Sequence, residues 1–142
     1  MKFLDETDPL DPERAIVDSE AVPLVDLSER EGVLPNVGIR PVDEVLGLDE
    51  LGAKLWYLDP GEEVGYHAHP VEEELYYVLR GKFSVKLGPP DDPTIEVVGP
   101  GTFFAGRALV GHGYRNVGDE PGVVLAIGAP TGDDRVIDPH ES

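Results

Sequence analysis

The stretch Gly61–Gly81, GEEVGYHAHPVEEELYYVLRG, contains two of the four histidines of the chain and its densest run of acidic residues. His67 and His69 are two positions apart, so on a strand both imidazoles would point to the same face. Glu74 lies in the next apolar run, ELYYVLRG, which is rich in aromatic and branched residues. A hairpin between the two runs would bring the carboxylate of Glu74 to the imidazole pair.

Two imidazoles and a carboxylate on one wall suit a first-row transition metal, because imidazole binds zinc, iron, copper and nickel and a carboxylate adds a harder oxygen ligand. His112, in the later segment GHGYRN, is a candidate fourth ligand, since a closed sheet can place a distant strand opposite the first pair. The alternative is four separately satisfied polar groups, which is common for a single histidine but improbable for four residues at these spacings. We therefore predict a divalent transition-metal ion (iron, manganese, zinc or nickel) bound by His67, His69, Glu74 and His112.

The spacing of these residues resembles the cupin superfamily. The first motif of that family is a Gly, five residues, His-x-His, three or four residues, a Glu, six residues and a Gly. Gly61, His67, His69, Glu74 and Gly81 fit this motif, and several fixed spacings in order make the match specific.

The second cupin motif is a Gly, five residues, Pro-x-Gly, two residues, a His, three residues and an Asn. Gly101, His112 and Asn116 fit it, whereas residues 107–109, Arg-Ala-Leu, replace the Pro-x-Gly. This departure alters a turn and removes no ligand position. Glu73 competes with Glu74 as ligand because the family accepts either gap in the first motif, but the six-residue spacing to the following glycine favours Glu74.

The resemblance implies an all-β fold, the double-stranded β-helix or jelly-roll barrel of the cupins, over residues 53–129. The residue pattern agrees, because the runs AKLWYL, VGYHAH, ELYYVL and KFSVKL alternate with turn signals at short intervals, as in an all-β sandwich or barrel. Ile39–Gly47 predicts a strand followed by a turn of helix. We assign a flexible acidic arm to residues 1–14, an N-terminal extension with edge strands to 15–52, and a polar tail to 130–142.

Four further residues are candidates for the pocket. Tyr76 shares strand parity with Glu74, and Tyr114 shares parity with His112, so each lines the pocket or packs in the core. Arg107 would grip an anionic substrate or form a surface ion pair. Ligand imidazoles also need partners for their free N–H groups, and Asn116 or a backbone carbonyl would serve.

The charge balance restricts the partners. The 142 residues include 29 acidic and 11 basic side chains, a formal net charge of -18, so nucleic acid is an unsuitable partner. Acidic residues spread along the chain favour adaptation to molar salt over an ordinary acidic protein, because screening by salt weakens their mutual repulsion. We therefore expect thermal stability to rise from dilute buffer to molar potassium chloride, and a flat or falling series of melts would exclude this halophilic interpretation.

The chain contains no cysteine, which excludes a disulfide framework and thiolate metal ligands. Its first residues lack a basic region followed by an apolar run, and no apolar stretch approaches the length of a membrane span, so we predict a cytoplasmic protein without a membrane partner. Short apolar pieces near the N-terminus and strands that are apolar on both faces predict a homodimer.

Two functions agree with these patterns. The resemblance implies a metalloenzyme acting on a small molecule, of the dioxygenase, isomerase or decarboxylase type, although fold alone does not choose the reaction. The alternative is a non-catalytic module that binds a small molecule or a metal ion as a sensor.

Overall fold

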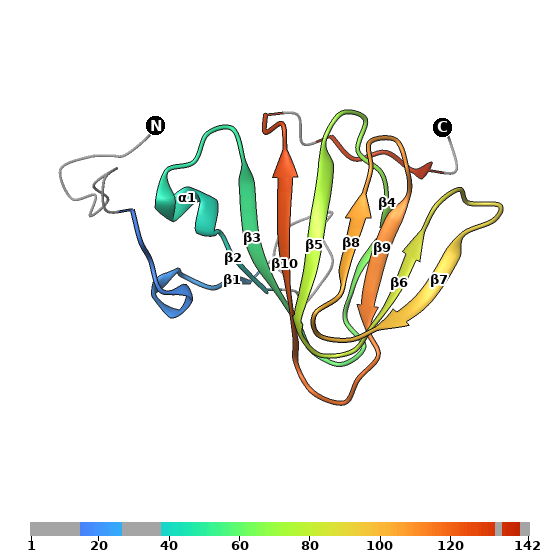
Figure 1. Cartoon of the computed structure of the whole chain (residues 1–142), viewed down its shortest axis with the longest axis horizontal. Helices are drawn as coiled ribbons and strands as arrows, with labels where there is room; N and C mark the ends of the chain where they lie inside the picture. Colours follow the sequence, from blue (N-terminus) through green and yellow to red (C-terminus); the bar gives the residue numbers. More distant parts are fainter. Residues whose placement is uncertain (1–14, 27–37, 133–134, 140–142) are drawn as a thin grey trace.

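The computed structural model describes residues 15–26, 38–132 and 135–139, and this part of the chain forms two antiparallel sheets (Figure 1). The strand order is β1-β2-β3-β10-β5-β8 in the six-stranded sheet and β4-β9-β6-β7 in the four-stranded sheet. The strands are β1 Val25–Asp26, β2 Gly38–Arg40, β3 Gly52–Leu58, β4 Glu63–His67, β5 Glu73–Arg80, β6 Phe83–Leu87, β7 Thr94–Val98, β8 Phe103–Gly106, β9 His112–Asn116 and β10 Gly122–Ala129. The all-β jelly-roll fold predicted from the sequence is confirmed.

Alternation of side chains places one row of each central strand in the core. In β5, Tyr76 and Val78 are buried while Leu75 and Leu79 are exposed, as the period of two along a strand requires. The buried rows of both sheets meet in one cluster, whose members are Leu58, Tyr76, Val78, Phe83, Val85, Phe104, Tyr114, Val124 and Ala126.

The turn between β5 and β6 shows why the first motif ends in glycine. Gly81 has a φ of 99°, in the region that residues with a side chain rarely adopt. A Cβ atom at this position would also lie 2.8 Å from the Cα atom of Gly122. The glycine therefore allows both the turn and the close approach of the chain that leads into β10.

The described part of the N-terminal extension lies at one edge of the six-stranded sheet. The 3-10 helix η2 spans Ser19–Ala21, and β1 and β2 continue the sheet beyond β3. The expected strand and helical turn within Ile39–Gly47 are confirmed as β2 and the short helix α1, Val42–Leu46. The arm assigned to residues 1–14 lies outside the described residues, as does the stretch 27–37.

Within the described ranges, no helix is both long enough and apolar enough to cross a membrane.

Candidate metal centre

Three strands and the segment after one of them bring the four predicted ligands together. His67 ends β4 and faces His112, the first residue of β9, in the antiparallel register. Glu74 is the second residue of β5 in the other sheet, and His69 follows β4 by two residues. Ligand atoms of these four side chains all lie within 4.8 Å of one another. The sequence prediction that they share one wall therefore agrees with the geometry, except that β4 ends at His67, before His69.

Backbone carbonyls orient all three imidazoles. The Nδ1 atoms of His67, His69 and His112 lie 2.6, 2.8 and 3.0 Å from the carbonyl oxygens of Gly65, Arg135 and Val110, respectively. A carbonyl oxygen only accepts, so each Nδ1 carries the hydrogen and donates it. In a neutral ring the lone pair is then on Nε2, the atom available to a metal ion.

The Nε2 atoms of two of the three imidazoles lie close to the same carboxylate oxygen. Nε2 of His112 lies 3.1 Å and Nε2 of His69 lies 3.4 Å from Oε1 of Glu74, and the hydroxyl of Tyr76 donates to that oxygen at 2.6 Å. Neutral rings would direct lone pairs at a carboxylate at these distances, which is repulsive. Either additional protons on the rings or one cation among the four groups removes the conflict. The donor set, three imidazoles and one carboxylate, fits a divalent transition-metal ion.

Burial and neighbouring charges shift the pKa values of these groups. Burial lowers the pKa of His67 to about 4, which keeps its Nε2 atom unprotonated near neutral pH. The hydrogen bond with Glu74 raises the pKa of His69 against an opposing effect of burial. Burial alone would raise the pKa of Glu74, but His112, His69 and Tyr76 together hold it well below its usual range. The carboxylate is therefore ionised, as a metal ligand must be.

Glycines at two positions make room for the ligands. A Cβ atom on Gly106 of β8 would lie 2.6 Å from atoms of the His112 imidazole. A Cβ atom on Gly128 of β10 would lie 2.7 Å from Oε2 of Glu72 and 3.3 Å from Cγ of Glu74. A larger residue at either position would therefore displace the side chain of His112 or of Glu72 and Glu74.

A cavity of about 260 Å³ is lined by three of the four predicted ligands, His67, His69 and Glu74, on the inner face of the barrel. Tyr76 and Tyr114 both line it, as their parity predicts, and both also belong to the hydrophobic core. The hydroxyl of Tyr114 is buried, and among the described residues it is the one buried side-chain polar atom without a hydrogen-bond partner. The remaining lining residues are Gly52, Ala53, Lys54, Trp56, Val64, Glu72, Ala126, Gly128 and Val136.

Glu72 is a cavity residue that the sequence motifs did not single out. Its Oε1 atom lies 3.8 Å from Nε2 of His69, and its side chain is only 18% exposed. Burial and the charge of Glu74 raise its pKa. Glu72 precedes β5 by one residue and has the same parity as Glu74, which is the signal that could have identified it.

Arg107 and Asn116, the other two pocket candidates, do not line this cavity. Arg107 is exposed after the end of β8 and lines a different depression, whose lining includes Glu73 and Glu74. Asn116 is at the opposite end of β9 from His112, about 13 Å along the strand at the usual rise per residue. It donates to the carbonyl oxygens of Leu58 and Glu120, so it holds the turn before β10 and supports no imidazole.

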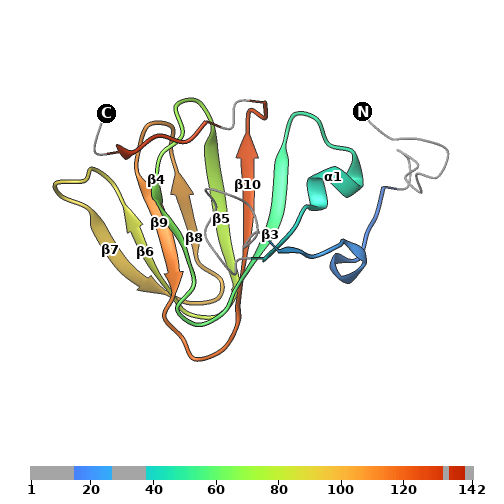
Figure 2. The ribbon, with the colours of Figure 1, turned by 180° about the vertical axis from the view of Figure 1, so that it is seen from behind.

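The C-terminal segment contributes to the site. Residues 135–139 return across the end of the barrel at which β10 finishes (Figure 2). Ala68 and Ile137 exchange two backbone hydrogen bonds of 3.1 and 2.8 Å. The carbonyl oxygen of Arg135 accepts from His69, and Val136 lines the cavity. Residues 135–139 of the predicted polar tail therefore help to orient one predicted ligand.

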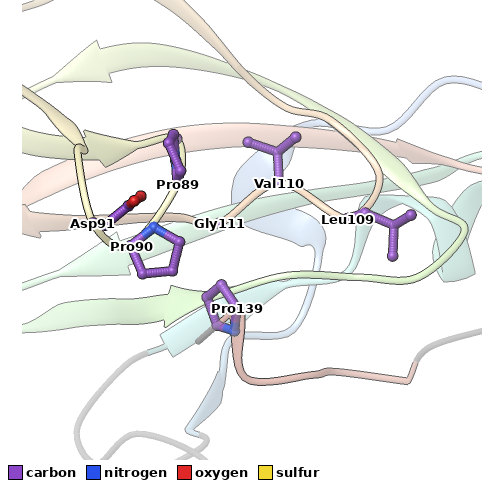
Figure 3. Close-up of a pocket in the computed structure, with 8 residues that line it drawn as sticks. Pro89, Pro90, Asp91, Leu109, Val110, Gly111 and Pro139 are labelled. Atoms are coloured by element: carbon purple, nitrogen blue, oxygen red, sulfur yellow. The ribbon is translucent and has the colours of Figure 1, made fainter. Parts of the chain in front are cut away.

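A larger depression of about 640 Å³ lies outside the ligand cluster. Figure 3 shows Pro89, Pro90 and Pro139 around it, with Leu109 and Val110 on the loop between β8 and β9. Asp91 is the one ionisable residue among its described lining residues, and no predicted metal ligand is among them. The smaller cavity is therefore the candidate functional site.

Comparison with known proteins agrees with this geometry. The family model for the cupin domain matches residues 54–128. No curated protein matches the chain. A sugar phosphate isomerase of the cupin superfamily from Silicibacter pomeroyi is 24% identical, with a TM-score of 0.68 over 82% of this chain and 76% of that chain.

Two other solved structures have the same fold. The polyketide cyclase RemF from Streptomyces resistomycificus is 26% identical, with a TM-score of 0.69 over 89% of both chains. A protein from Thermotoga maritima described as a predicted oxalate decarboxylase is 21% identical, with a TM-score of 0.69 over 81% of this chain and 98% of that chain. The descriptions of these three similar proteins name three different activities, so the fold alone does not identify a reaction.

Proposed function

This chain belongs to the cupin domain family, and on that premise we propose that it is a metalloenzyme that acts on a small molecule. The proposed ligands of its divalent metal ion are His67, His69, Glu74 and His112. The reaction is of the dioxygenase, isomerase or decarboxylase type, and the isomerase and the predicted decarboxylase among the similar structures support this range.

One observation carries the proposal. Three imidazoles donate from Nδ1 to backbone carbonyls, which leaves their Nε2 atoms for a cation beside the ionised carboxylate of Glu74. A cluster of separately satisfied polar groups would not direct three basic nitrogens at one another and at a carboxylate. A metal ion would stabilise this arrangement, because one cation would bind all four groups in place of the protons that would otherwise have to separate them.

The residues of the chain have distinct roles in this proposal. Tyr76 donates to Glu74 and fixes the orientation of the carboxylate, while the carbonyl oxygens fix the tautomers of the imidazoles. Trp56 and Val64 exclude water from one side of the cavity. When bound, the metal ion supplies Lewis-acid or redox chemistry to a substrate in the cavity.

We also propose that the protein is a homodimer formed through the outer face of the six-stranded sheet. Two rows of outward residues run in register across the sheet, and neither row contains a charged side chain: Leu55, Leu125, Tyr77 and Phe103 form one row across β3, β10, β5 and β8, and Ile127, Leu75 and Ala105 form the other across β10, β5 and β8. Phe103 is 63% exposed. Because the net charge is -18, two copies would meet with less repulsion over these uncharged rows than over surface that is rich in carboxylates.

Thermal melts with added metal ions test the proposed function. We expect iron, manganese, zinc or nickel to raise the melting temperature of chelator-treated protein, because an ion that binds only the folded state stabilises it. Glu74→Gln should lose most of this shift, whereas Glu73→Gln, the same change on an exposed neighbour, should retain it. Equal shifts in both variants would contradict the site.

Substrate screening of the metal-loaded protein under aerobic and anaerobic conditions then distinguishes an enzyme from a sensor. Turnover of a small molecule that is lost with the metal ion supports the enzyme. Binding of small molecules without turnover in either condition would favour the non-catalytic module.

A further inference from the structure

We propose that the cavity beside the metal cluster takes a small, uncharged and largely apolar ligand, in contrast to an anion such as a sugar phosphate or a dicarboxylate. This inference rests on the proposed function for the position of the substrate, and it specifies the chemical class. Three features of the cavity support the inference: its volume, its apolar wall, and the ion pairs formed by the charged side chains that line it.

The volume limits the ligand to a small molecule. Ligand pockets usually measure about 300–1,000 Å³, and this cavity measures about 260 Å³. A compound with a single ring fits such a space, whereas an extended polycyclic compound does not.

One side of the cavity is apolar. Trp56 and Val64 belong to its wall and pack against the hydrophobic core. Ala126 of β10 and Val136 of the C-terminal segment add further apolar surface. Such walls favour a ligand with a hydrocarbon or aromatic body, because its burial removes apolar surface from water.

Lys54 is the one cationic side chain among the described residues that line the cavity, and it is already paired. Its Nζ atom lies 2.8 Å from Oδ2 of Asp43. The same oxygen accepts from the backbone N–H of Ala53 at 3.1 Å, which fixes the carboxylate in place. Lys54 also interacts electrostatically with Glu72. An entering anion would therefore compete with two carboxylates for one ammonium group.

The charges around the cavity leave no positive excess for an anion. Glu72 and Glu74 contribute two carboxylates, and Lys54 is matched by Asp43. A divalent ion at the cluster would only compensate Glu72 and Glu74. Since burial of an unpaired charge costs far more free energy than burial of a neutral group, the site favours the neutral ligand with or without the ion.

The single tryptophan of the chain reports on this cavity. Trp56 is the only tryptophan in the sequence, so ¹⁵N-labelled protein gives one indole N–H resonance, and it comes from the cavity wall. The probes are 4-fluoroacetophenone and 4-fluorobenzoate, which have similar size and shape and differ in charge, with cyclohexanone as a non-aromatic neutral probe and dihydroxyacetone phosphate as an anionic one. Fluorine NMR of the two aromatic probes gives their dissociation constants.

We expect the neutral probes to shift the Trp56 resonance and 4-fluoroacetophenone to bind at least about tenfold more tightly than 4-fluorobenzoate. Tighter binding of 4-fluorobenzoate or of dihydroxyacetone phosphate would overturn the inference. Absence of a Trp56 shift with both neutral probes up to their solubility would also overturn it.

Two variants test the charge argument directly. Asp43→Asn removes the partner of Lys54, and Glu72→Gln removes a carboxylate from the cavity wall, so each should raise the affinity for 4-fluorobenzoate severalfold and change that for 4-fluoroacetophenone little. Asp119→Asn, the same charge change at an exposed turn between β9 and β10, is the matched control and should change neither. Unchanged 4-fluorobenzoate binding in both folded cavity variants would contradict the inference.

The same titrations on chelator-treated and metal-loaded protein separate the two proposals. If the protein binds no metal but still prefers 4-fluoroacetophenone, the proposed metalloenzyme fails and the ligand class stands. If it binds metal and prefers the anionic probes, the ligand class fails and the metal site stands.

Discussion

The two faces of the six-stranded sheet differ in chemistry although the same strands form both. On β5, the inward residues Glu74 and Tyr76 hydrogen-bond to each other beside the imidazoles, whereas the outward residues Leu75 and Leu79 are apolar and 44% and 47% exposed. On β5, the inner face thus carries buried polar groups that are hydrogen-bonded, and the outer face leaves apolar groups exposed. A one-residue shift of register would exchange the two sets, so strand parity decides both the chemistry and the proposed assembly.

Phe104 and Phe103 are neighbours on β8 that point to opposite faces of the sheet. Substituting them should give the largest difference in stability between the two faces. Phe104 is buried and stacks on Tyr76, with ring centroids 4.7 Å apart. We expect Phe104→Ala to lower the free energy of unfolding by about 3–5 kcal/mol, because it leaves a cavity in the core. Phe103→Ala should cost at most about 0.5 kcal/mol in dilute protein. Urea denaturation measures both, and equal losses would contradict the assigned parity.

A charge on the outer face tests the proposed dimer. We expect Phe103→Asp to weaken self-association about a hundredfold, because a buried aromatic contact of about 2–3 kcal/mol is replaced by an unpaired carboxylate. Light scattering at micromolar concentration in a salt-matched buffer measures the mass, and metal content should stay unchanged. A monomeric wild-type protein would refute the homodimer.

Much of the barrel and the clustering of the four candidate ligands could be predicted because short-range patterns determine them. Alternation specified the strands, and the fixed spacing around His67 and His69 indicated the candidate ligands and the family. Glu74 was preferred to Glu73 as the candidate ligand because six residues lie between it and Gly81. The structure turns Glu74 inward and leaves Glu73 exposed.

The rest depends on contacts between residues distant in sequence. The pairing of Ala68 with Ile137, 69 positions apart in the chain, has no local signal, and the family model ends at residue 128, before this segment. The sequence left the partner of the imidazoles open between Asn116 and a backbone carbonyl. Backbone carbonyls fill that role, and Asn116 holds a turn. Spacing identifies a residue and does not specify its partner.

A substitution in the C-terminal segment, residues 135–139, should have the smallest effect of those tested on the inner face. Ile137→Pro removes the N–H that donates to Ala68 at 2.8 Å, so the carbonyl of Arg135 should hold His69 less well. We expect metal affinity to fall about tenfold, as for other groups that orient a ligand. Ile137→Ala retains the backbone donor and is the control.

Metal competition titrations, with ¹⁵N shifts of the His69 ring as a reporter of its tautomer, measure this effect. Equal affinity and an unchanged tautomer in Ile137→Pro would show that the segment does not position His69.

The most direct test of the account is the metal stoichiometry of protein purified without added metal. Elemental analysis of wild type, His67→Ala, His69→Ala, His112→Ala and His140→Ala compares the three proposed ligands with the remaining histidine of the sequence. We predict bound divalent metal in wild type and His140→Ala and strong loss in the other three, because each of them removes one of four ligands. Full occupancy in His112→Ala would contradict the four-ligand site.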